Sequence, residues 1–517
     1  MTAPARAGSD WSGEHWAAVA ETHSAVVFFA GERAWKLKKP VDLGFPDFST
    51  PEGRAVACER ETELNRRFAP GEYLGVAEVL DPAGRVCDHL VMMRRMPAAR
   101  RLSTMVRNHE PVTAMLHQVA RILAAQHARA PRGPQITEQG TCDALRGRWA
   151  DNLAQTRQLL ELPRRSRGAG ASADEIERLA CRFLAGRAPL FDRRIQEGRI
   201  VDGHGDLLAD DIFCLDDGPR ILDCLDFDDR LRWVDGVDDA AFLAMDLERL
   251  RAPALAHEFM SAYAEFSADP APPSLWHHYI AYRAFVRAKA ACLQEDGWAA
   301  AEAAEAADLA LRHLRAGSVK FVLVGGLPGT GKSSLAGTVA DRLGFTVLSS
   351  DRIRKELAGV PAEADASAPY AAGIYSPEWT ERTYAELLRR AVVLLAHGES
   401  VVADASFTSA QQRDAAVTAS ATVCADLVQI RCAASRDLAA ARLRARRRGT
   451  SDADPGIAAQ MEAAADPWPE AIVIETEGGG IDTGRVPALR VKQVLETIHP
   501  DDHQYAERPP VPYMLPG

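Results

Sequence analysis

The sequence predicts a multidomain protein in which an α+β domain with two lobes precedes an α/β domain built on a parallel sheet. The chain has 517 residues, which is too long for a single hydrophobic core. In the first half, strand-like segments precede Leu102 and mostly helical sequence follows it, which is the α+β pattern. In the second half, short apolar strands alternate with helical segments, which predicts a parallel sheet covered on both faces.

The first half begins with four segments that have the apolar and β-branched composition of strands: SAVVFFAG, ERAWKLKK, YLGVAEVLD and RVCDHLVMMRRM. One helical segment, ACERETELNRRFA, interrupts them. The helical sequence that follows is broken between residues 200 and 229 by two short strand-like segments, IFCL and RILDCLDF. This order predicts a small β-rich lobe followed by a larger helical lobe.

The boundary between the halves is predicted where a helical period gives way to a short apolar strand. Ala-rich helical sequence ends near Gly317, and the strand-like KFVLVGG follows at once. We therefore expect one domain over residues 1–316 and a second over residues 317–498. Residues 499–517 contain five prolines and form a Pro-rich tail.

Composition excludes several classes of protein. Hydrophobic residues make up 47% and charged residues 26%, as in ordinary globular proteins, and the formal charge of −11 disfavours nucleic acid as a partner. The sequence has no membrane-spanning apolar run, and its first residues, MTAPARAGSDWSGEHW, lack the apolar core of a signal sequence. The nine cysteines are scattered without a C-x-x-C pair, which is typical of free thiols in a reducing compartment. We expect a cytoplasmic protein, and its oligomeric state is left open.

The segment GLPGTGKSS fits the phosphate-binding pattern G-x-x-x-x-G-K-[ST], directly after an apolar strand and at the start of a helix. Its glycines let backbone N–H groups surround a phosphate, and the helix adds its positive N-terminal end. Lys332 would place its charge on the β- and γ-phosphates, and Ser333 would coordinate Mg²⁺. The sequence therefore predicts an ATP or GTP site that consists of Gly326, Gly329, Thr330, Gly331, Lys332, Ser333 and Ser334.

Two carboxylates follow the next strands, where ligands bind in an open α/β sheet. Asp351 follows FTVLSS and could accept a proton from an acceptor hydroxyl, while Arg352 or Arg354 grips the substrate; the alternative for Asp351 is a helix N-cap. Asp404, in ESVVADAS, could complete the magnesium shell, or it is a plain turn residue. The arginine run ARLRARRRG could close over the transferring phosphate, or it is a solvated helix.

Together GLPGTGKSS, SSDRIRKEL, VVADASF and the arginine run resemble the P-loop kinase family of gluconate kinase and polynucleotide kinase. The resemblance covers about residues 318–498. It implies a nucleotide at Lys332 and Ser333, Asp351 as general base, and Arg442 or Arg446 as the arginine of a lid.

The segment VDGHGDLLADDIFCL resembles the catalytic loop of the aminoglycoside and choline phosphotransferases, which have an asparagine five residues after the Asp of H-G-D. The resemblance implies that Asp206 is the catalytic base and that position 211 binds magnesium. Asp211 stands there in this sequence, and its carboxylate offers oxygen ligands but adds negative charge. The segment RILDCLDFDD supplies a second metal carboxylate, for which we choose Asp226 and keep Asp223 as the alternative.

The segment AWKLKKP resembles the kinase strand whose lysine binds the α- and β-phosphates. Lys36 is in the A-x-K position, and Lys38 on the same face is the alternative. In ACERETELNRR, Glu61 is the expected ion-pair partner of that lysine, with Glu59 as the alternative. The sequence has no G-x-G-x-x-G loop before the strand, only a turn that contains Gly31.

The whole chain resembles bacterial fusions of an aminoglycoside phosphotransferase-like domain with a P-loop ATP-binding domain. This implies a bifunctional kinase that uses ATP and Mg²⁺ to phosphorylate hydroxyls of a small molecule such as a sugar, an aminocyclitol or a similar polyol. Because Asp211 departs from the pattern, the alternative is a ligand-sensing pseudokinase that regulates the P-loop half. A third hypothesis is phosphorylation of nucleic-acid ends, suggested by SSDRIR and the arginine run and disfavoured by the acidic composition.

Overall fold

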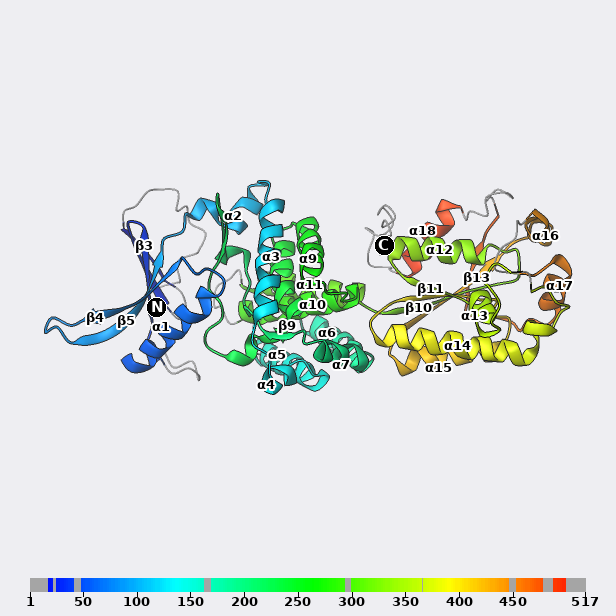
Figure 1. The fold of residues 1–517 in the computed structure, drawn as a ribbon, viewed down its shortest axis with the longest axis horizontal. Helices are drawn as coiled ribbons and strands as arrows, with labels where there is room; N and C mark the ends of the chain where they lie inside the picture. Colours follow the sequence, from blue (N-terminus) through cyan, green and yellow to red (C-terminus); the bar gives the residue numbers. More distant parts are fainter. Residues whose placement is uncertain are drawn as a thin grey trace. The chain divides into compact units, whose positions relative to one another are not determined.

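The computed structural model describes residues 17–21, 25–40, 48–161, 169–292, 299–364, 366–445, 452–477 and 487–498 (Figure 1). They belong to two compact units. The first takes the residues up to Ala173 with Phe191–Ala271 and Tyr279–Ala310, and the second takes Asp174–Leu190, Pro272–His278 and the chain from Leu311. The domain limits at residues 316 and 317 stay predictions, and the Pro-rich tail lies outside the described residues.

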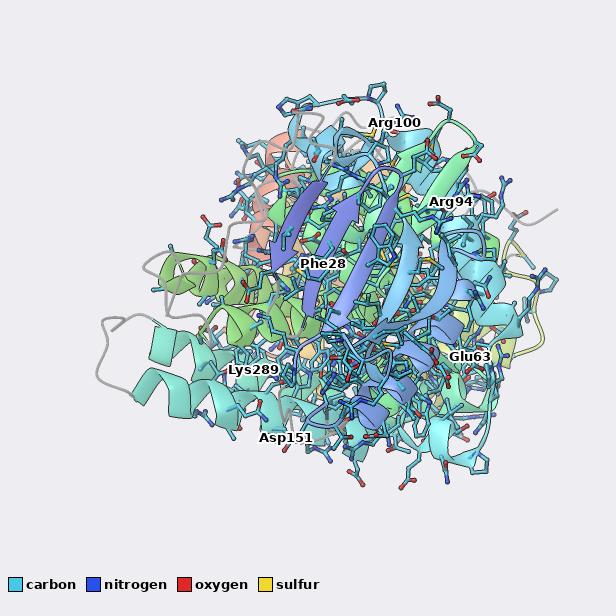
Figure 2. All side chains as sticks on the ribbon, turned by 90° about the vertical axis from the view of Figure 1, so that its left-hand side faces the viewer. Phe28, Glu63, Arg94, Arg100, Asp151 and Lys289 are labelled. Atoms are coloured by element: carbon cyan, nitrogen blue, oxygen red, sulfur yellow. The ribbon has the colours of Figure 1, made fainter. Side chains whose placement is uncertain are left out.

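The first unit begins with a five-stranded antiparallel sheet of order β1-β2-β3-β5-β4, which Figure 2 shows with Phe28 and Arg94 labelled on it. Side chains alternate along strand β3, so Ala34, Lys36 and Lys38 share one face, and Ala34 and Lys38 are buried. The strands are β1 (Ala17–Glu21), β2 (Ala25–Ala30), β3 (Arg33–Lys38), β4 (Tyr73–Leu80) and β5 (Val86–Arg94).

Helix α1 (Pro51–Arg66) packs against this sheet. It begins at a local signal: the Thr50 hydroxyl accepts a hydrogen bond from the Gly53 amide at 3.1 Å, and Pro51 occupies the first turn. Arg54 donates to both oxygens of Asp88 in β5 at 2.9 Å. These contacts fix the helix so that Glu61 lies at the buried face of the sheet.

The helical part of the first half carries the HGD segment between two short antiparallel strand pairs, β6 with β9 and β7 with β8. The predicted strand IFCL is β7, whereas β8 ends at Ile221 and leaves LDCLDF as an irregular segment. The short strands are β6 (Ile200–Asp202), β7 (Ile212–Leu215), β8 (Gly218–Ile221) and β9 (Trp233–Asp235). The helices are α2 (Leu102–Arg107), α3 (Thr113–Arg129), α4 (Pro134–Glu138), α5 (Cys142–Glu161), α6 (Ala169–Ala185), α7 (Ala188–Gln196), α8 (Gly236–Arg249), α9 (Pro253–Ser267), α10 (Pro273–Cys292) and α11 (Ala299–Ala316).

The second unit contains a parallel five-stranded sheet of order β11-β12-β10-β13-β14. Figure 1 shows α12 and α18 on one face of the sheet and α14 and α15 on the other. The strands are β10 (Lys320–Gly325), β11 (Thr346–Ser349), β12 (Val401–Asp404), β13 (Asp426–Ala433) and β14 (Ile472–Glu475). The helices are α12 (Lys332–Leu343), α13 (Ser350–Leu357), α14 (Pro377–Ala396), α15 (Ala410–Thr422), α16 (Arg436–Ala445), α17 (Pro455–Ala463) and α18 (Ala488–Ile498).

The predicted fold class is confirmed: a two-lobed, kinase-like α+β part precedes an α/β P-loop domain. The core of the second unit lies between the sheet and helices α12 and α18, and it includes Val322, Leu335, Val402 and Leu495. Over the stretches of chain that the structure describes, we find no helix with the length and apolarity that crossing a membrane requires.

Candidate active sites

The P-loop turns from β10 into α12 with glycines in the left-handed region of backbone space. Gly329 has φ 81° and Gly331 has φ 90°, which other residues rarely adopt. A side chain at position 329 would also place its Cβ 2.6 Å from the Ala439 carbonyl oxygen. No side chain caps the start of α12, so its first N–H groups are placed to bind a phosphate.

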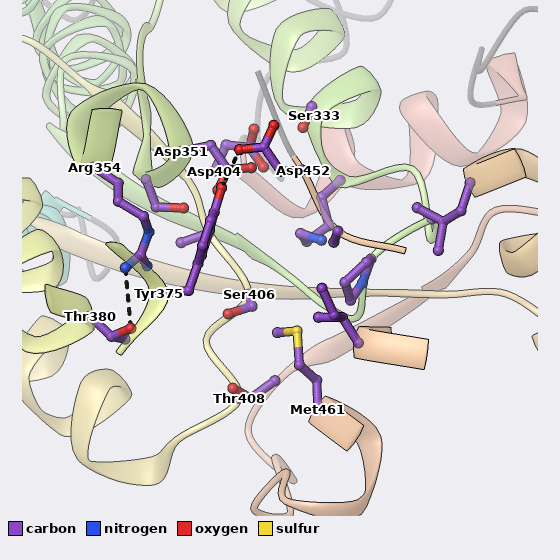
Figure 3. A pocket seen from close by; sticks show the side chains of 18 of the residues that line it. Ser333, Asp351, Arg354, Tyr375, Thr380, Asp404, Ser406, Thr408, Asp452 and Met461 are labelled. Carbon is purple, nitrogen blue, oxygen red and sulfur yellow. Dashed lines mark hydrogen bonds between the residues drawn. The ribbon is translucent and has the colours of Figure 1, made fainter. Parts of the chain in front are cut away.

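A cavity of about 1010 Å³ adjoins the P-loop (Figure 3). Most of the residues predicted for this site line it: Gly329, Gly331, Lys332, Ser333, Ser334, Asp351, Asp404 and Arg442. Gly326 and Thr330 belong to the loop backbone behind it, where Gly326 has φ 131° and the Thr330 hydroxyl donates to Leu327 O at 2.7 Å. Arg446 lies outside the described residues.

Parallel strands deliver these side chains to one edge of the sheet. Asp404 is the last residue of β12, next to β10, and only 8% of it is exposed. Asp351 lies in the first turn of α13, where Ser349 takes the N-cap position, so the cap considered for Asp351 is not formed. Lys332 Nζ donates to Leu327 O at 3.0 Å, which keeps its charge over the P-loop.

The cavity is also lined by a buried cation, Arg354. Its Nη1 donates only to neutral oxygens, Ile374 O at 2.8 Å and Thr380 Oγ1 at 3.2 Å, and its guanidinium lies 5.0 Å from the centre of the Tyr375 ring. Only 6% of Arg354 is exposed, and its Nε has no hydrogen-bond partner. Burial lowers the pKa of Arg354, and the negative charge of Asp351 opposes this shift.

Two further residues that line this cavity, Tyr375 and Asp452, were not predicted. Tyr375 donates to Asp452 Oδ2 at 2.7 Å (Figure 3), and the fully buried Lys355 donates to Asp452 Oδ1 at 3.2 Å. These two contacts hold the Asp452 carboxylate in place. No local sequence signal marks either residue, because the contacts join positions that are far apart in the chain.

In the first unit, Glu61 lies between two lysines. Its Oε1 is 2.9 Å from Lys36 Nζ and its Oε2 is 2.8 Å from Lys38 Nζ. Each lysine has a second carboxylate, Asp223 at 2.7 Å from Lys36 and Asp226 at 2.6 Å from Lys38. The alternative partner Glu59 is exposed to solvent. The structure thus brings together both candidate lysines and both candidate metal carboxylates.

Two carboxylates of helix α8 accept hydrogen bonds from backbone amides of the HGD loop. Asp239 accepts hydrogen bonds from the amides of His204 at 2.7 Å and Gly205 at 2.8 Å, and it contacts His127 Nε2 at 2.9 Å. Asp246 accepts from the amide of Ala209 at 3.0 Å. Because α8 is buried along most of its length, these contacts give Asp206 a rigid support.

The carboxylates of this loop act on one another. Burial raises the pKa of Asp206 to about 6, with Arg287 opposing the shift and Asp223 adding to it. Burial, Asp223 and Asp206 together raise the pKa of Asp211 well above its ordinary value. Lys36 lowers the pKa of Asp223, whereas burial and Glu61 raise that of Asp226. Of the two candidate metal carboxylates, Asp223 is therefore the one that acts most strongly on Asp206 and Asp211.

A family model and several solved structures are similar to parts of this chain. The family model of the AAA domain AAA_33 matches residues 321–467. A choline/ethanolamine kinase family protein from Mesorhizobium loti is 14% identical over 59% of this chain and 94% of its own, with a TM-score of 0.38. A gluconokinase from Sinorhizobium meliloti 1021 is 16% identical over 36% of this chain and 98% of its own, with a TM-score of 0.25.

Two mycobacterial proteins match almost the whole chain. Uncharacterized protein Rv2004c of Mycobacterium tuberculosis (strain ATCC 25618 / H37Rv) and Uncharacterized protein Mb2027c of Mycobacterium bovis are each 44% identical over 463 residues, 89% of this chain and 92% of theirs. The P-loop domain and the kinase-like lysine–glutamate pair make the chain an ATP-dependent phosphotransferase. With this identity over this share of both sequences, the chain belongs to the family of the mycobacterial proteins Rv2004c and Mb2027c.

Proposed function

We propose that the chain is a bifunctional, Mg·ATP-dependent kinase of small molecules that phosphorylates hydroxyls of a sugar, an aminocyclitol or a similar polyol. The observation that carries the proposal is that each unit brings a candidate lysine together with carboxylates. Lys332 and Asp351 line one cavity, and Lys36 contacts Asp223, whose charge adds to the raised pKa of Asp206. Phosphoryl transfer depends mainly on positioning and charge neutralisation, so such a pair is the core of a kinase site.

In the C-terminal site, the P-loop amides and Lys332 bind the β- and γ-phosphates of ATP. Asp351 accepts the proton of the acceptor hydroxyl as the new bond to phosphorus forms. Arg442, which lies beside Gly329 O at 3.4 Å, neutralises charge on the transferring phosphate. Arg446 stays a candidate for a second lid arginine.

The donor sets of both sites fit Mg²⁺. Ser333 and Asp404 line the same cavity, and Asp211 and Asp223 form part of a mutually repelling group of carboxylates. Among the described residues, no three His, Cys, Asp or Glu side chains are grouped to hold a metal unaided. Mg²⁺ is usually held by one or two carboxylates together with phosphate oxygens. When bound, Mg²⁺ neutralises charge on the phosphates of ATP.

The chemistry of Arg354 narrows the acceptor of the C-terminal site. The Arg354 guanidinium is buried, its Nη1 donates to neutral oxygens, and its Nε has no hydrogen-bond partner, so a negatively charged oxygen supplied by the acceptor would stabilise it. The wall around it carries hydroxyls of Thr380, Ser406 and Thr408. This favours a polyol that bears an acidic group over a cationic aminocyclitol at this site.

In the N-terminal site, Lys36 binds the phosphates and Glu61 orients it, while Asp206 accepts the proton of the acceptor hydroxyl. Asp211 and one further carboxylate hold the metal. We prefer Asp223 over Asp226 for this second ligand, because half of its side chain is exposed and its charge acts on both Asp206 and Asp211.

One observation favours a second candidate function for this half. The raised pKa of Asp211 means that this carboxyl loses its proton, and becomes a metal ligand, less readily than an ordinary carboxyl. A ligand-sensing pseudokinase that regulates the P-loop half would need no such ligand.

Product masses distinguish the two functions. The full chain, Asp206→Asn, Lys332→Ala and the double variant are each incubated with Mg·ATP and a panel of polyols and their acid derivatives. Two activities predict that each single variant loses one phosphorylation and keeps the other, and that the double variant loses both. A single product that is lost with Lys332→Ala and unaffected by Asp206→Asn would contradict bifunctionality and support the pseudokinase.

A further inference from the structure

Each of the two lysines that contact Glu61 also pairs with an aspartate, and these two lysine–aspartate pairs differ in their exposure to water. The side chains of Lys36 and Asp223 are 17% and 51% exposed, whereas those of Lys38 and Asp226 are 5% and 17% exposed. Lys38 Nζ also lies 5.0 Å from the centre of the Phe48 ring. Lys38 is therefore the more enclosed of the two cations that hold the Glu61 carboxylate.

Because of this difference in exposure, the Lys36–Asp223 pair can separate at a lower cost in free energy than the Lys38–Asp226 pair. Removing one member of a buried ion pair leaves an uncompensated charge and costs several kcal/mol, while an exposed pair contributes little. In the proposed nucleotide complex, Lys36 would bind the phosphates, so its pair with Asp223 would be given up and its charge would be shared between Glu61 and the phosphates. Lys38, which contacts the second oxygen of Glu61 at 2.8 Å, would then be the cation that keeps Glu61 in place.

We propose that Lys38 and Asp226 are positioning residues of the N-terminal site: they hold Glu61, and with it helix α1, while Lys36 and Asp223 engage the nucleotide. Asp226 contributes a second carboxylate to Lys38, at 2.6 Å. The same helix is held elsewhere by Arg54 to Asp88, and its C-cap residue Arg67 donates through Nη2 to Gly203 O at 2.9 Å.

The proposal has a catalytic part, which rests on the proposed kinase function of this half, and a structural part, which does not. The structural part is tested by hydrogen–deuterium exchange of α1 in the free, full-length chain. Lys38→Met should speed exchange around Glu61 about tenfold or more, and Lys36→Met should speed it much less, because Lys38 is the more enclosed of the two cations that contact Glu61. Equal or faster exchange in Lys36→Met overturns the proposal, whatever the activity of this half.

The catalytic part is tested by kinetics in the Lys332→Ala background, which silences the C-terminal site. Lys38→Met should lower kcat/KM for ATP by about 10²-fold, as expected when a binding group is misplaced by about 1 Å. The double variant Lys38→Met/Asp226→Leu removes the unpaired charge and should restore Tm without restoring kcat/KM. If kcat/KM recovers together with Tm, the pair only stabilises the fold and the positioning role is wrong.

Lys39→Met is the matched control. This neighbouring lysine pairs with Glu21 at 2.7 Å and does not contact Glu61, so its loss should change neither exchange in α1 nor kcat/KM. If the Lys332→Ala background shows no turnover at all, the proposed function of the N-terminal half fails. The exchange measurement still decides whether Lys38 and Asp226 hold α1.

Discussion

The guanidinium of Arg442 lies against Thr476, to whose hydroxyl it donates at 3.0 Å and to whose carbonyl it donates at 2.8 Å. The Thr476 hydroxyl in turn donates to Thr330 O in the P-loop at 2.8 Å. A residue just beyond β14 thus connects the proposed lid arginine of α16 to the phosphate-binding loop. These hydrogen bonds fix Arg442 next to the phosphate-binding loop, which lowers the cost of ordering it for its proposed role.

This relationship predicts the effect of Thr476→Val, which keeps the shape of the side chain and removes its hydroxyl. Arg442 loses an acceptor and Thr330 O loses a donor, so we expect the C-terminal kcat to fall about tenfold and stability to fall by about 1 kcal/mol. The measurement is turnover and chemical unfolding in the Asp206→Asn background. Thr422→Val, on an exposed helix end, is the control, and an equal loss of activity there would contradict the prediction.

Lys332→Ala should abolish phosphoryl transfer by the C-terminal site while leaving Tm nearly unchanged. The change removes the charge that is proposed to bind the β- and γ-phosphates, and the hydrogen bond that it removes goes to a neutral oxygen, Leu327 O. Turnover is measured in the Asp206→Asn background, so that only this site reports. Lys492→Ala, on the surface of α18, should retain normal turnover. Normal turnover of Lys332→Ala would show that the P-loop is not the donor site.

The sequence was most informative where chemistry is encoded locally. The P-loop is one continuous segment, and its strand–loop–helix context follows from apolar pattern and glycines alone. The choice between Asp223 and Asp226 was out of reach, because it depends on how the chain turns after β8. That strand ends at Ile221, and Asp223 then adopts a φ of 62°, a conformation that no propensity predicts for aspartate at this position.

The rest of the candidate site could not be predicted because it is assembled by topology. Thr476 reaches the P-loop only because β14 pairs with β13 and β13 with β10. Tyr375 and Asp452 meet through a hydrogen bond that spans 77 positions of sequence. Lys36 and Lys38 share a face of β3. Strand periodicity therefore predicts that both side chains point to the same side, and it does not indicate which of them binds the phosphates.

Asp351→Asn should lower the C-terminal kcat by about 10²–10⁴-fold and leave nucleotide affinity unchanged. The amide keeps the size of the side chain but cannot accept the proton of the acceptor hydroxyl. Nucleotide binding is followed by calorimetry and kcat by product mass, with the exposed Asp341→Asn as the control. A variant that loses stability at unchanged kcat would assign Asp351 a structural role.

Arg354→Met should separate stability from function. The apolar side chain fills a similar volume and removes a buried charge that donates to neutral oxygens, so Tm should change little. The loss of a charged hydrogen bond to the acceptor, worth about 1.5–3 kcal/mol, should raise the acceptor KM about 10- to 100-fold with KM for ATP unchanged. A neutral polyol should bind equally well to both forms. If the KM of an acidic acceptor does not change, Arg354 does not bind its anion.

The pH dependence of the N-terminal site tests Asp206. Burial raises its pKa to about 6 from an ordinary value of 3.8, so the carboxyl is protonated, and unable to accept a proton, below that pH. In the Lys332→Ala background, kcat/KM should therefore rise with pH through about 6, since this ratio reports the ionisation of the free enzyme. The neutral carboxyl is favoured in the folded state, so its contribution to stability is present below about pH 4 and is lost as pH rises through 6. Asp206→Asn escapes that loss and should be more stable than its parent above pH 6.

A second variant tests whether Asp206 is the group that controls the acid limb of kcat/KM. Arg287 carries the positive charge that most strongly opposes the shift of Asp206. Arg287→Met removes this charge, which should raise the pKa of Asp206 further and move the acid limb of kcat/KM to higher pH. An acid limb that stays in place or moves to lower pH would mean that another group controls it. The assignment of Asp206 as the proton acceptor would then be wrong, because the limb must follow the electrostatics of the residue that takes the proton.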